Sequence, residues 1–331
     1  MQRECKYTSG LRKAIFTGAI LCISLGYSQS TMRVWGSPQM SGVLRLWEHG
    51  FSKQHPDVQF RDELHGTASG IAGLYTGVAD IAVMGREIWP TETAAYESVM
   101  SRKPLEIEVA TGSYDTPKVT FALVIYVHKS NPLTKLTLDQ VARVFGQPRT
   151  AGGAAIRTWD QLEDQLGLRG EWTGKPIHCY NFDYDNDKSV FFRRRVLGER
   201  FRWDSRTREF SNVVNANGET QDAGKLILEA LAQDPLGIAV SNPHYANQSV
   251  KALALEAGDK AVKASSETVR DRTYPLTRAV YIYSRKPLDP NIAAFLRYIL
   301  SDEGQKDVAT EGSYLPLTRD RVSSGLRAIE E

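Results

Sequence analysis

The sequence predicts an α/β fold, and three observations lead to that prediction. Short apolar segments, such as 80–84 and 237–240, alternate along the chain with segments whose apolar residues recur at helical spacing. The 331 residues suffice for two domains of about 150 residues each. Hydrophobic residues make up 41% and charged residues 24%, as in ordinary soluble globular proteins. Continued alternation of strand and helix indicates largely parallel sheets.

The first third of the chain begins with a strand at 33–36 that ends in a turn. A helix follows, in which Leu44, Trp47 and Phe51 share one face. The other elements expected before residue 118 are a strand at 58–60, a short helix after 66, a strand at 80–84, a helix at 92–100 and a strand at 105–110.

The nearly continuous apolar run 119–127 indicates a strand buried on both faces, as in a parallel sheet. Thr137 and Gln140 form a capping-box pattern, and Gly146 marks the end of that helix. Residues 147–175 are expected to form a surface loop anchored by Trp159. The later elements are expected as strands at 177–180 and 237–240 and as helices at 189–197, 225–232, 292–300 and 303–309, with the segment 274–283 following a polar stretch over 257–272.

Residues 1–30 have the pattern of a secretory signal. Arg12 and Lys13 precede an apolar stretch over 14–26, which is too short to span a bilayer. A periplasmic or secreted location is therefore expected after cleavage. Removing residues 1–30 takes away four basic and one acidic residue, which leaves 37 Lys+Arg, 38 Asp+Glu and a net charge of −1. This charge does not favour nucleic-acid binding, and the basic run 193–195 is interpreted as a solvated helix face or a docking surface.

The segment 66–87 carries the chemistry that points to a ligand. Thr67, Ser69 and Gly70 stand at the expected start of a helix, before the strand 80–84. Hydroxyl groups and unpaired backbone N–H groups at a helix start can hold an anion. Capping of the helix by Thr67 is an alternative role, and it is compatible with anion binding.

Taken together, these segments resemble the phosphate-type periplasmic solute-binding proteins of ABC importers, which are PstS-like. The resemblance covers nearly all of residues 31–320. The segments that carry it, in order, are 36–47, 51–56, 66–86, 131–133 with 136–145, 192–198, 235–238, 274–278, and 301–305 with 312–316.

The resemblance implies a two-lobed periplasmic-binding-protein-like fold with a ligand cleft and a hinge between the lobes. The first lobe is expected to contain 31–113 and 276–331, and the second 114–275. The hinge is expected near 114–118 and 273–276. The implied partners are a small anionic, phosphate-like ligand and an ABC permease in the membrane. The protein is expected to be a monomer without cofactor or metal.

The resemblance also implies site residues in the first lobe. Thr67 stands at the place of a ligand-contacting serine, and Ser69 and Gly70 continue the same loop. Ser37 and Gln39 are candidates from the first loop, where Pro38 lacks an N–H donor.

Two positions after the strand 80–84 depart from the family. Gly85 stands where orthophosphate-specific members carry an Asp that accepts a hydrogen bond from the ligand. Arg86 follows it and offers a bidentate fork to an ionised oxyanion or a carboxylate. The alternative for Arg86 is an ion pair with Glu87, Glu92 or Asp80.

The loop before the helix 189–197 departs further. Family members carry an Arg and then Ser-Gly-Thr, whereas this chain has Phe182 and then Asn186, Asp187 and Lys188. Lys188 attracts an anion and Asp187 repels one. Asp187 is expected to cap the helix.

Two other function classes compete with solute binding. An exported hydrolase with His65 as base is one, but the chain has no G-x-S-x-G elbow and its six His residues lack metal-ligand spacing. The other is a binding fold that acts as a sensor or assembly partner without phosphate. The preferred prediction is a non-enzymatic, exported protein that binds a small oxyanion.

Overall fold

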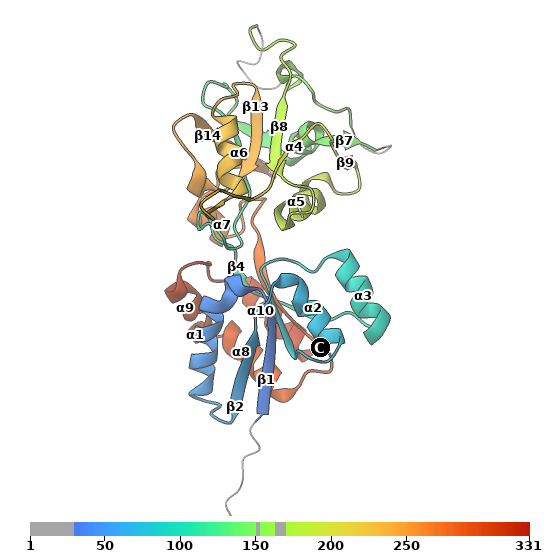
Figure 1. The fold of residues 1–331 in the computed structure, drawn as a ribbon, viewed down its shortest axis with the longest axis vertical. Helices are drawn as coiled ribbons and strands as arrows, with labels where there is room; N and C mark the ends of the chain where they lie inside the picture. The colour runs from blue at the N-terminus through green and yellow to red at the C-terminus, as the bar shows by residue number, and fades with distance from the viewer. Residues whose placement is uncertain (1–29, 150–152, 163–169) are drawn as a thin grey trace, which may run out of the picture.

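The computed structural model describes residues 30–149, 153–162 and 170–331. They form two α/β bodies that lie end to end along the long axis of the molecule (Figure 1). This arrangement confirms the predicted two-lobed α/β class. The secretory signal expected over 1–30 lies, apart from Ser30, outside the described residues. Within the described ranges, no helix is long and apolar enough to cross a bilayer.

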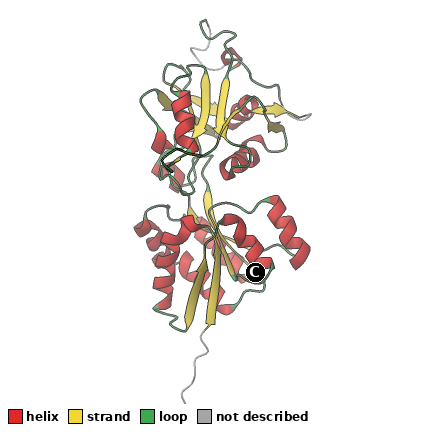
Figure 2. Ribbon diagram, viewed as in Figure 1, coloured by secondary structure: helices red, strands yellow, loops and turns green. Residues whose placement is uncertain are grey.

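The first body is built on a five-stranded sheet in the order β2-β1-β3-β17-β4. Helices flank this sheet (Figure 2). The strands are β1 (Ser30–Gly36), β2 (Val58–Glu63), β3 (Ile81–Met84), β4 (Leu105–Thr111) and β17 (Ala279–Ser284). The helices are α1 (Ser41–Ser52), α2 (Thr67–Tyr75), α3 (Pro90–Met100), α8 (Pro290–Leu300), α9 (Asp302–Glu311) and α10 (Arg319–Glu330), with a 3-10 turn η1 (Pro38–Met40).

The second body has its own five-stranded sheet, in the order β10-β8-β13-β5-β14. These strands are β5 (Val124–His128), β8 (His178–Phe182), β10 (Arg208–Phe210), β13 (Gly237–Ser241) and β14 (Val250–Ala252). The helices are α4 (Leu138–Phe145), α5 (Asp187–Phe192), α6 (Ala223–Leu231) and α7 (Ser266–Arg270), with a π-helical turn η3 (Arg193–Leu197) after α5 and 3-10 turns η2 (Trp159–Gln161) and η4 (Pro243–Tyr245). Short strands complete it: β6 (Lys135–Thr137), β7 (Gly146–Pro148), β9 (Phe201–Trp203), β11 (Val213–Val214), β12 (Thr220–Gln221), β15 (Ala254–Ala257) and β16 (Lys260–Val262).

The sheets are mixed, so the expectation of largely parallel sheets is wrong. In the first sheet β17 runs antiparallel to both β3 and β4. In the second, β5 runs antiparallel to both β13 and β14. The apolar run that suggested a parallel strand is buried on both faces, yet β5 within it runs antiparallel to both of its neighbours. Burial on both faces therefore reports the position of a strand in its sheet and leaves its direction open.

Local sequence signals explain several helix ends. The Thr137 hydroxyl accepts a hydrogen bond from the Gln140 N–H (3.0 Å), and the Gln140 side chain accepts one from the Thr137 N–H (2.9 Å). The predicted capping box is thus confirmed. Helix α10 was not predicted, because its sequence is polar and buries little besides Gly325 and Ile329. Gly325 lets the helix approach Leu300, whose methyl group lies 2.8 Å from where a Cβ would stand.

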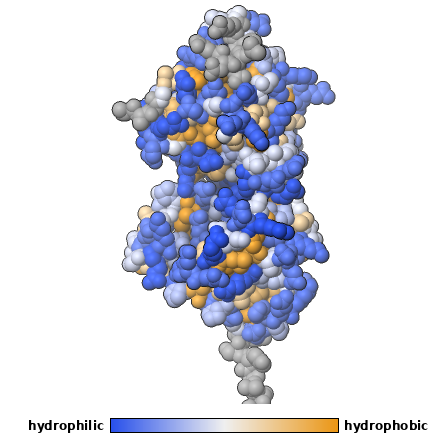
Figure 3. All heavy atoms as spheres, turned by 180° about the vertical axis from the view of Figure 1, so that it is seen from behind, coloured by the Kyte–Doolittle hydropathy of each residue, from blue (hydrophilic) through white to orange (hydrophobic). Residues whose placement is uncertain are grey.

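Two stretches of chain connect the bodies (Figure 1), and the waist there is narrow and mostly hydrophilic when seen from behind (Figure 3). Backbone hydrogen bonds join the two stretches: Gly112 N–H to the Arg278 carbonyl (2.9 Å) and Leu123 N–H to the Leu276 carbonyl (3.1 Å). Leu276 packs in the core of the second body and Val280 in that of the first. Arg272, in the second stretch, has a left-handed backbone with φ 62°, which carries a strain cost outside glycine.

Candidate functional site

Three side-chain oxygens from two separate segments surround Gly85, just after the end of β3. A Cβ at position 85 would stand 2.7 Å from Thr120 Oγ1, 3.5 Å from Gln39 Oε1 and 3.8 Å from Ser37 Oγ. The Thr120 hydroxyl donates to the carbonyl of Gly85. Ser37 is buried, whereas Gln39 is exposed. The structure thus brings the candidates Ser37 and Gln39 together, and an acidic side chain at position 85 would require the Thr120 hydroxyl to shift.

The start of α2 lies beside this cluster. The N–H of Gly66 donates to the Gly36 carbonyl (2.9 Å), which ties the loop before α2 to the end of β1. Gly66, with φ 132°, is the N-cap, so Thr67 is the first helical residue and does not cap the helix. The half-buried Thr67 therefore stands in the first turn, where backbone N–H groups lack partners inside the helix.

Ser69 and Gly70 support the start of α2. The Ser69 hydroxyl donates to the Gly66 carbonyl (2.7 Å) and so closes the first turn. A Cβ at Gly70 would lie 3.0 Å from the Ala82 methyl group and 3.6 Å from the Gly36 Cα. The helix therefore packs closely on β1 and β3 only because position 70 has no side chain.

Arg86 is buried and paired within the first body. Its guanidinium donates to both carboxylate oxygens of Glu92, at 2.6 and 2.7 Å, and lies over the Trp89 ring at 3.9 Å. It also donates to the Glu87 carbonyl (3.0 Å). Arg86 was considered either as a ligand group or as a member of an ion pair. In the structure it forms an ion pair with Glu92. Its role as a ligand group stays a prediction.

In the second body, Asn186 caps α5 by accepting the Lys188 N–H (3.1 Å). The expectation that Asp187 is the cap is wrong, because the cap lies one residue earlier and an Asn oxygen serves equally well. Asp187 is the first residue of α5. The Lys188 ammonium lies 3.1 Å from Asp187 Oδ1, and 5.3 and 5.4 Å from the ring centroids of Phe121 and Phe182.

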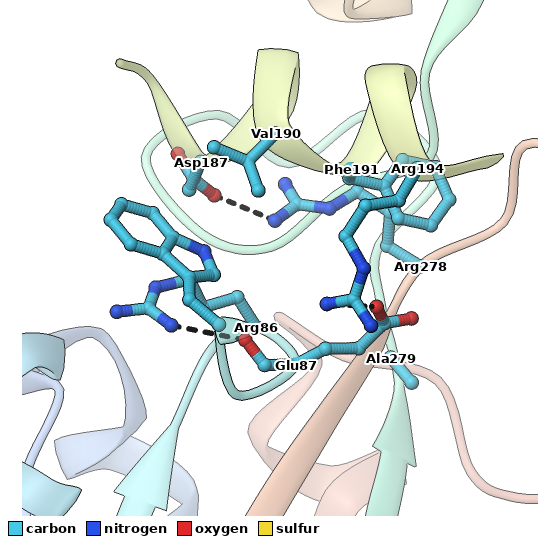
Figure 4. Close-up of a pocket in the computed structure, with 9 residues that line it drawn as sticks. Arg86, Glu87, Asp187, Val190, Phe191, Arg194, Arg278 and Ala279 are labelled. Atoms are coloured by element: carbon cyan, nitrogen blue, oxygen red, sulfur yellow. Dashed lines mark hydrogen bonds and ion pairs between the residues drawn. The ribbon is translucent and has the colours of Figure 1, made fainter. Parts of the chain in front are cut away.

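Arg278 joins the two bodies. Its Nη2 donates to Asp187 Oδ2 at 2.6 Å, as Figure 4 shows, and the side chain is only 3% exposed. Its Nη1 is buried without a hydrogen-bond partner in the part of the chain that the structure describes. Burial alone raises the pKa of Asp187, but the charges of Arg278 and Lys188 outweigh it and hold that pKa well below its usual range.

The sequence did not identify Arg278 as a site residue, although it ends the motif 274–278 of the resemblance. An Arg that follows a run of Tyr, Pro, Leu and Thr carries no signal of burial. Only the pairing of the two bodies shows that its guanidinium lies between them.

A small cavity of about 10 Å³ lies between the bodies, with room for roughly one water. The groups at its wall are Arg86, Glu87, Trp89, Asp187, Val190, Phe191, Arg194, Arg278 and Ala279 (Figure 4). Arg194 reaches from the second body to the Glu87 carboxylate (3.2 Å) and the Ile88 carbonyl (3.1 Å). Two ion pairs therefore link the bodies beside the candidate site.

Two basic side chains in or near the run 193–195 have acidic partners. Arg194 pairs with Glu87, and Arg200 lies 2.7 Å from Asp139. The absence of nucleic-acid binding stays a prediction, which these pairs favour. His65 pairs with Glu63 (2.9 Å) on the surface. No cluster of three or more His, Cys, Asp or Glu that could hold a metal occurs among the described residues.

Known proteins resemble this chain over most of its length. The phosphate-binding protein PstS of Pseudomonas aeruginosa is 29% identical over 301 residues, which are 89% of this chain and 85% of that protein. Protein SphX of Synechococcus elongatus is 25% identical over 290 residues, 85% of this chain and 76% of SphX.

Solved structures share the fold at low identity. PstS from Borrelia burgdorferi has a TM-score of 0.55 at 17% identity, covering 87% of this chain and 99% of that one. An ABC-type phosphate transport receptor from Vibrio cholerae has a TM-score of 0.54 at 19% identity, covering 86% and 99%. A family model described as the PBP superfamily domain matches residues 26–303. The PstS-like resemblance is confirmed, and the chain belongs to the PBP superfamily.

Proposed function

We propose that this protein is an exported solute-binding protein of a phosphate ABC importer. It binds a small oxyanion between its two bodies, and phosphate is the ligand that we expect. The observation that carries the proposal is the meeting of Ser37, Gln39 and Thr120 around Gly85, beside the first turn of α2. The PstS relatives, named for phosphate binding, support the same ligand.

The first body supplies the neutral part of the site. The first N–H groups of α2 and the Thr67 hydroxyl donate to the oxyanion, and the positive end of the nine-residue helix favours its charge. Ser37 and Gln39 add polar contacts from the loop after β1. Ser69 and Gly70 hold this turn in place and act through the backbone.

Positive charge comes from Lys188 of the second body and from Arg278 at the junction of the bodies. Lys188 lies over Phe121, directly after Thr120, and so stands near the segment that reaches Gly85. Arg278, which was not predicted, adds a buried guanidinium at the junction. Arg86 fixes the loop after β3 through Glu92 and contributes to the ligand only if that pair opens.

The rest of the biological setting follows from the same proposal. The chain is exported by the signal over 1–30 and works as a monomer with a membrane permease. The first lobe contains 31–113 and 276–331, and the second contains 114–275. The lobes close around the anion by bending at the two connecting stretches, as in other binding proteins of this kind. The chain binds and delivers its ligand without catalysis.

Calorimetric titration with inorganic phosphate tests the proposal. Thr67→Val keeps the shape of the side chain and removes its hydroxyl, so we expect phosphate affinity to fall about tenfold. Thr310→Val is the matched control, because the Thr310 hydroxyl bonds a carbonyl within α9, on the surface. A wild-type protein that binds no phosphate would overturn the proposal and favour a sensor or assembly role without phosphate.

A further inference from the structure

A hollow of about 740 Å³ opens on the second body, away from the cluster around Gly85. It lies beside the π-helical turn η3 and the strand β9, on the side of that body where Figure 1 labels α5, β7 and β9. It shares only Val190 and Arg194 with the wall of the small cavity between the bodies. Its volume is within the range of small-molecule sites, roughly 300–1,000 Å³.

The wall of this hollow is strongly basic. Four of its lining residues are arginines and one is acidic: Arg149, Arg193, Arg194, Arg202 and Glu199. The chain after residue 30 has a net charge of −1, so such an excess of positive charge is a local feature. Arg194 pairs with Glu87 (3.2 Å), whereas Arg149 and Arg202 are exposed and form no ion pair with a described residue. Two guanidinium groups at the wall are therefore open to an anion.

Aromatic rings stand among these arginines. Tyr184 and Trp203 form an edge-to-face pair with ring centroids 5.8 Å apart, and Phe201 also lines the hollow. Tyr184 is 44% exposed, and it is the only aromatic residue among the exposed large hydrophobic residues of the described chain. Aromatic rings and guanidinium planes both stack on flat groups. The wall thus offers an apolar contact next to its positive charge.

Arg193 connects the charged and the aromatic parts of the wall. Its guanidinium lies 3.6 Å from the centroid of the Tyr184 ring, and its Nη2 donates to the Tyr184 carbonyl (3.2 Å). Its Nε is buried and has no hydrogen-bond partner among the described residues, which is costly. Arg193 begins η3, and single π-helical turns occur frequently at functional sites. These features favour a role in binding over a purely structural one.

We propose that this hollow is a second ligand site, which binds a small organic anion whose phosphate or carboxylate is attached to a flat apolar group. The guanidinium groups of Arg149 and Arg202 bind the anionic group, and the rings of Tyr184 and Trp203 contact the flat group. Exposed ion pairs alone contribute little, so the anionic and the apolar contacts are both needed. The site therefore takes a different ligand from the oxyanion expected between the bodies.

Calorimetric titration with 1-naphthyl phosphate tests the inference, in the presence of excess inorganic phosphate that fills the site between the bodies. We expect this probe to bind the wild type at least about tenfold more tightly than 1-naphthol, which lacks the anionic group. In the double variant Arg149→Gln, Arg202→Gln its affinity should fall at least about tenfold, because two charge-assisted contacts are lost. Both side chains are exposed, so the variant should fold.

Three further variants locate the bound probe. Arg208→Gln changes an exposed arginine of the second body that does not line the hollow, and it should keep the wild-type affinity. Tyr184→Ala removes the exposed ring and should weaken binding severalfold. Thr67→Val, in the first body, should leave the affinity for 1-naphthyl phosphate unchanged. Thermal melting of each variant shows whether it is folded.

The inference and the proposed function can fail separately. Unchanged affinity for 1-naphthyl phosphate in the double variant, or an equal loss in Arg208→Gln, would overturn the second site. Binding that is weakened only by Thr67→Val would place the probe between the bodies and overturn it as well. A wild type that does not bind the probe at millimolar concentration has no such site. None of these results affects the binding of inorganic phosphate, which is measured by its own titration.

Discussion

Two of the ion pairs made by arginines at the wall of the small cavity are built differently. Arg86 and Glu92 both belong to the first body, nine-tenths of the Arg86 side chain is buried, and the pair is closed on itself by two hydrogen bonds. Asp187 and Arg278 join the second body to the connecting stretch through one hydrogen bond, and one guanidinium nitrogen stays free of partners in the described chain. The first pair is independent of how the bodies move, whereas the second depends on it.

This difference indicates separate tasks. A closed, bidentate pair within one body stabilises the loop 85–92 and leaves little donor capacity for a ligand. A pair that spans two bodies and is incompletely satisfied can exchange partners when the bodies approach. We therefore expect an anion to reach the charge at Arg278 and Lys188, and Arg86 to hold the loop.

The largest effect on stability is expected from Arg86→Ala. The change leaves the Glu92 carboxylate buried without its cation, which should lower the free energy of unfolding by about 3 kcal/mol. Urea unfolding measures it. Arg61→Ala, at a pair whose Arg is 70% exposed, is the control, with an expected loss under about 1 kcal/mol. A loss as small as the control's would show that the closed pair does not stabilise the loop.

The phosphate affinity of the same variant tests whether Arg86 contacts the ligand. If Arg86 serves the loop, folded Arg86→Ala should lose less phosphate affinity than Thr67→Val does. The opposite order would place Arg86 on the ligand and revise the division of tasks between the two pairs.

A smaller stability loss and a larger loss of affinity are expected from Arg278→Ala. In this variant the Asp187 side chain, which is 33% exposed, still forms its ion pair with Lys188. The free energy of unfolding should therefore fall by about 2 kcal/mol, which is less than for Arg86→Ala. Phosphate affinity should fall at least about tenfold, because a buried donor to the anion is removed. Retained affinity would show that Arg278 has only a structural role. Arg270→Ala, at an exposed pair with Asp271, is the control.

The sequence predicted the architecture well because its signals are local. The capping box at Thr137 and the apolar run before His128 each act within one turn or one strand. The direction of two strands was not predicted. Strands β5 and β17 run antiparallel to their neighbours β13 and β3, and this pairing depends on contacts between distant segments.

The candidate site was predicted less completely, for a physical reason. Ser37 and Gln39 were identified with the loop that carries them, whereas Thr120 and Arg278 enter only through contacts between distant segments. Arg86 shows the complementary limit: the sequence named Glu92 as one possible partner, but only geometry decides between a partner and a ligand.

The smallest expected effect is on the pH dependence of stability, and it concerns the ion pair between Asp187 and Arg278. The pKa of Asp187 is lowered in the folded state, so its ionisation stabilises the fold above the unfolded value of about 4. That contribution is lost as pH falls from about 4 toward the lower folded value, because the proton then binds the unfolded chain more readily. Urea unfolding of wild type and Asp187→Asn should therefore show a difference in stability at pH 6 that shrinks below pH 4. Because other carboxylates titrate equally in both proteins, the difference reports Asp187, and a difference that stays constant down to pH 3 would mean that Arg278 does not hold this carboxylate ionised.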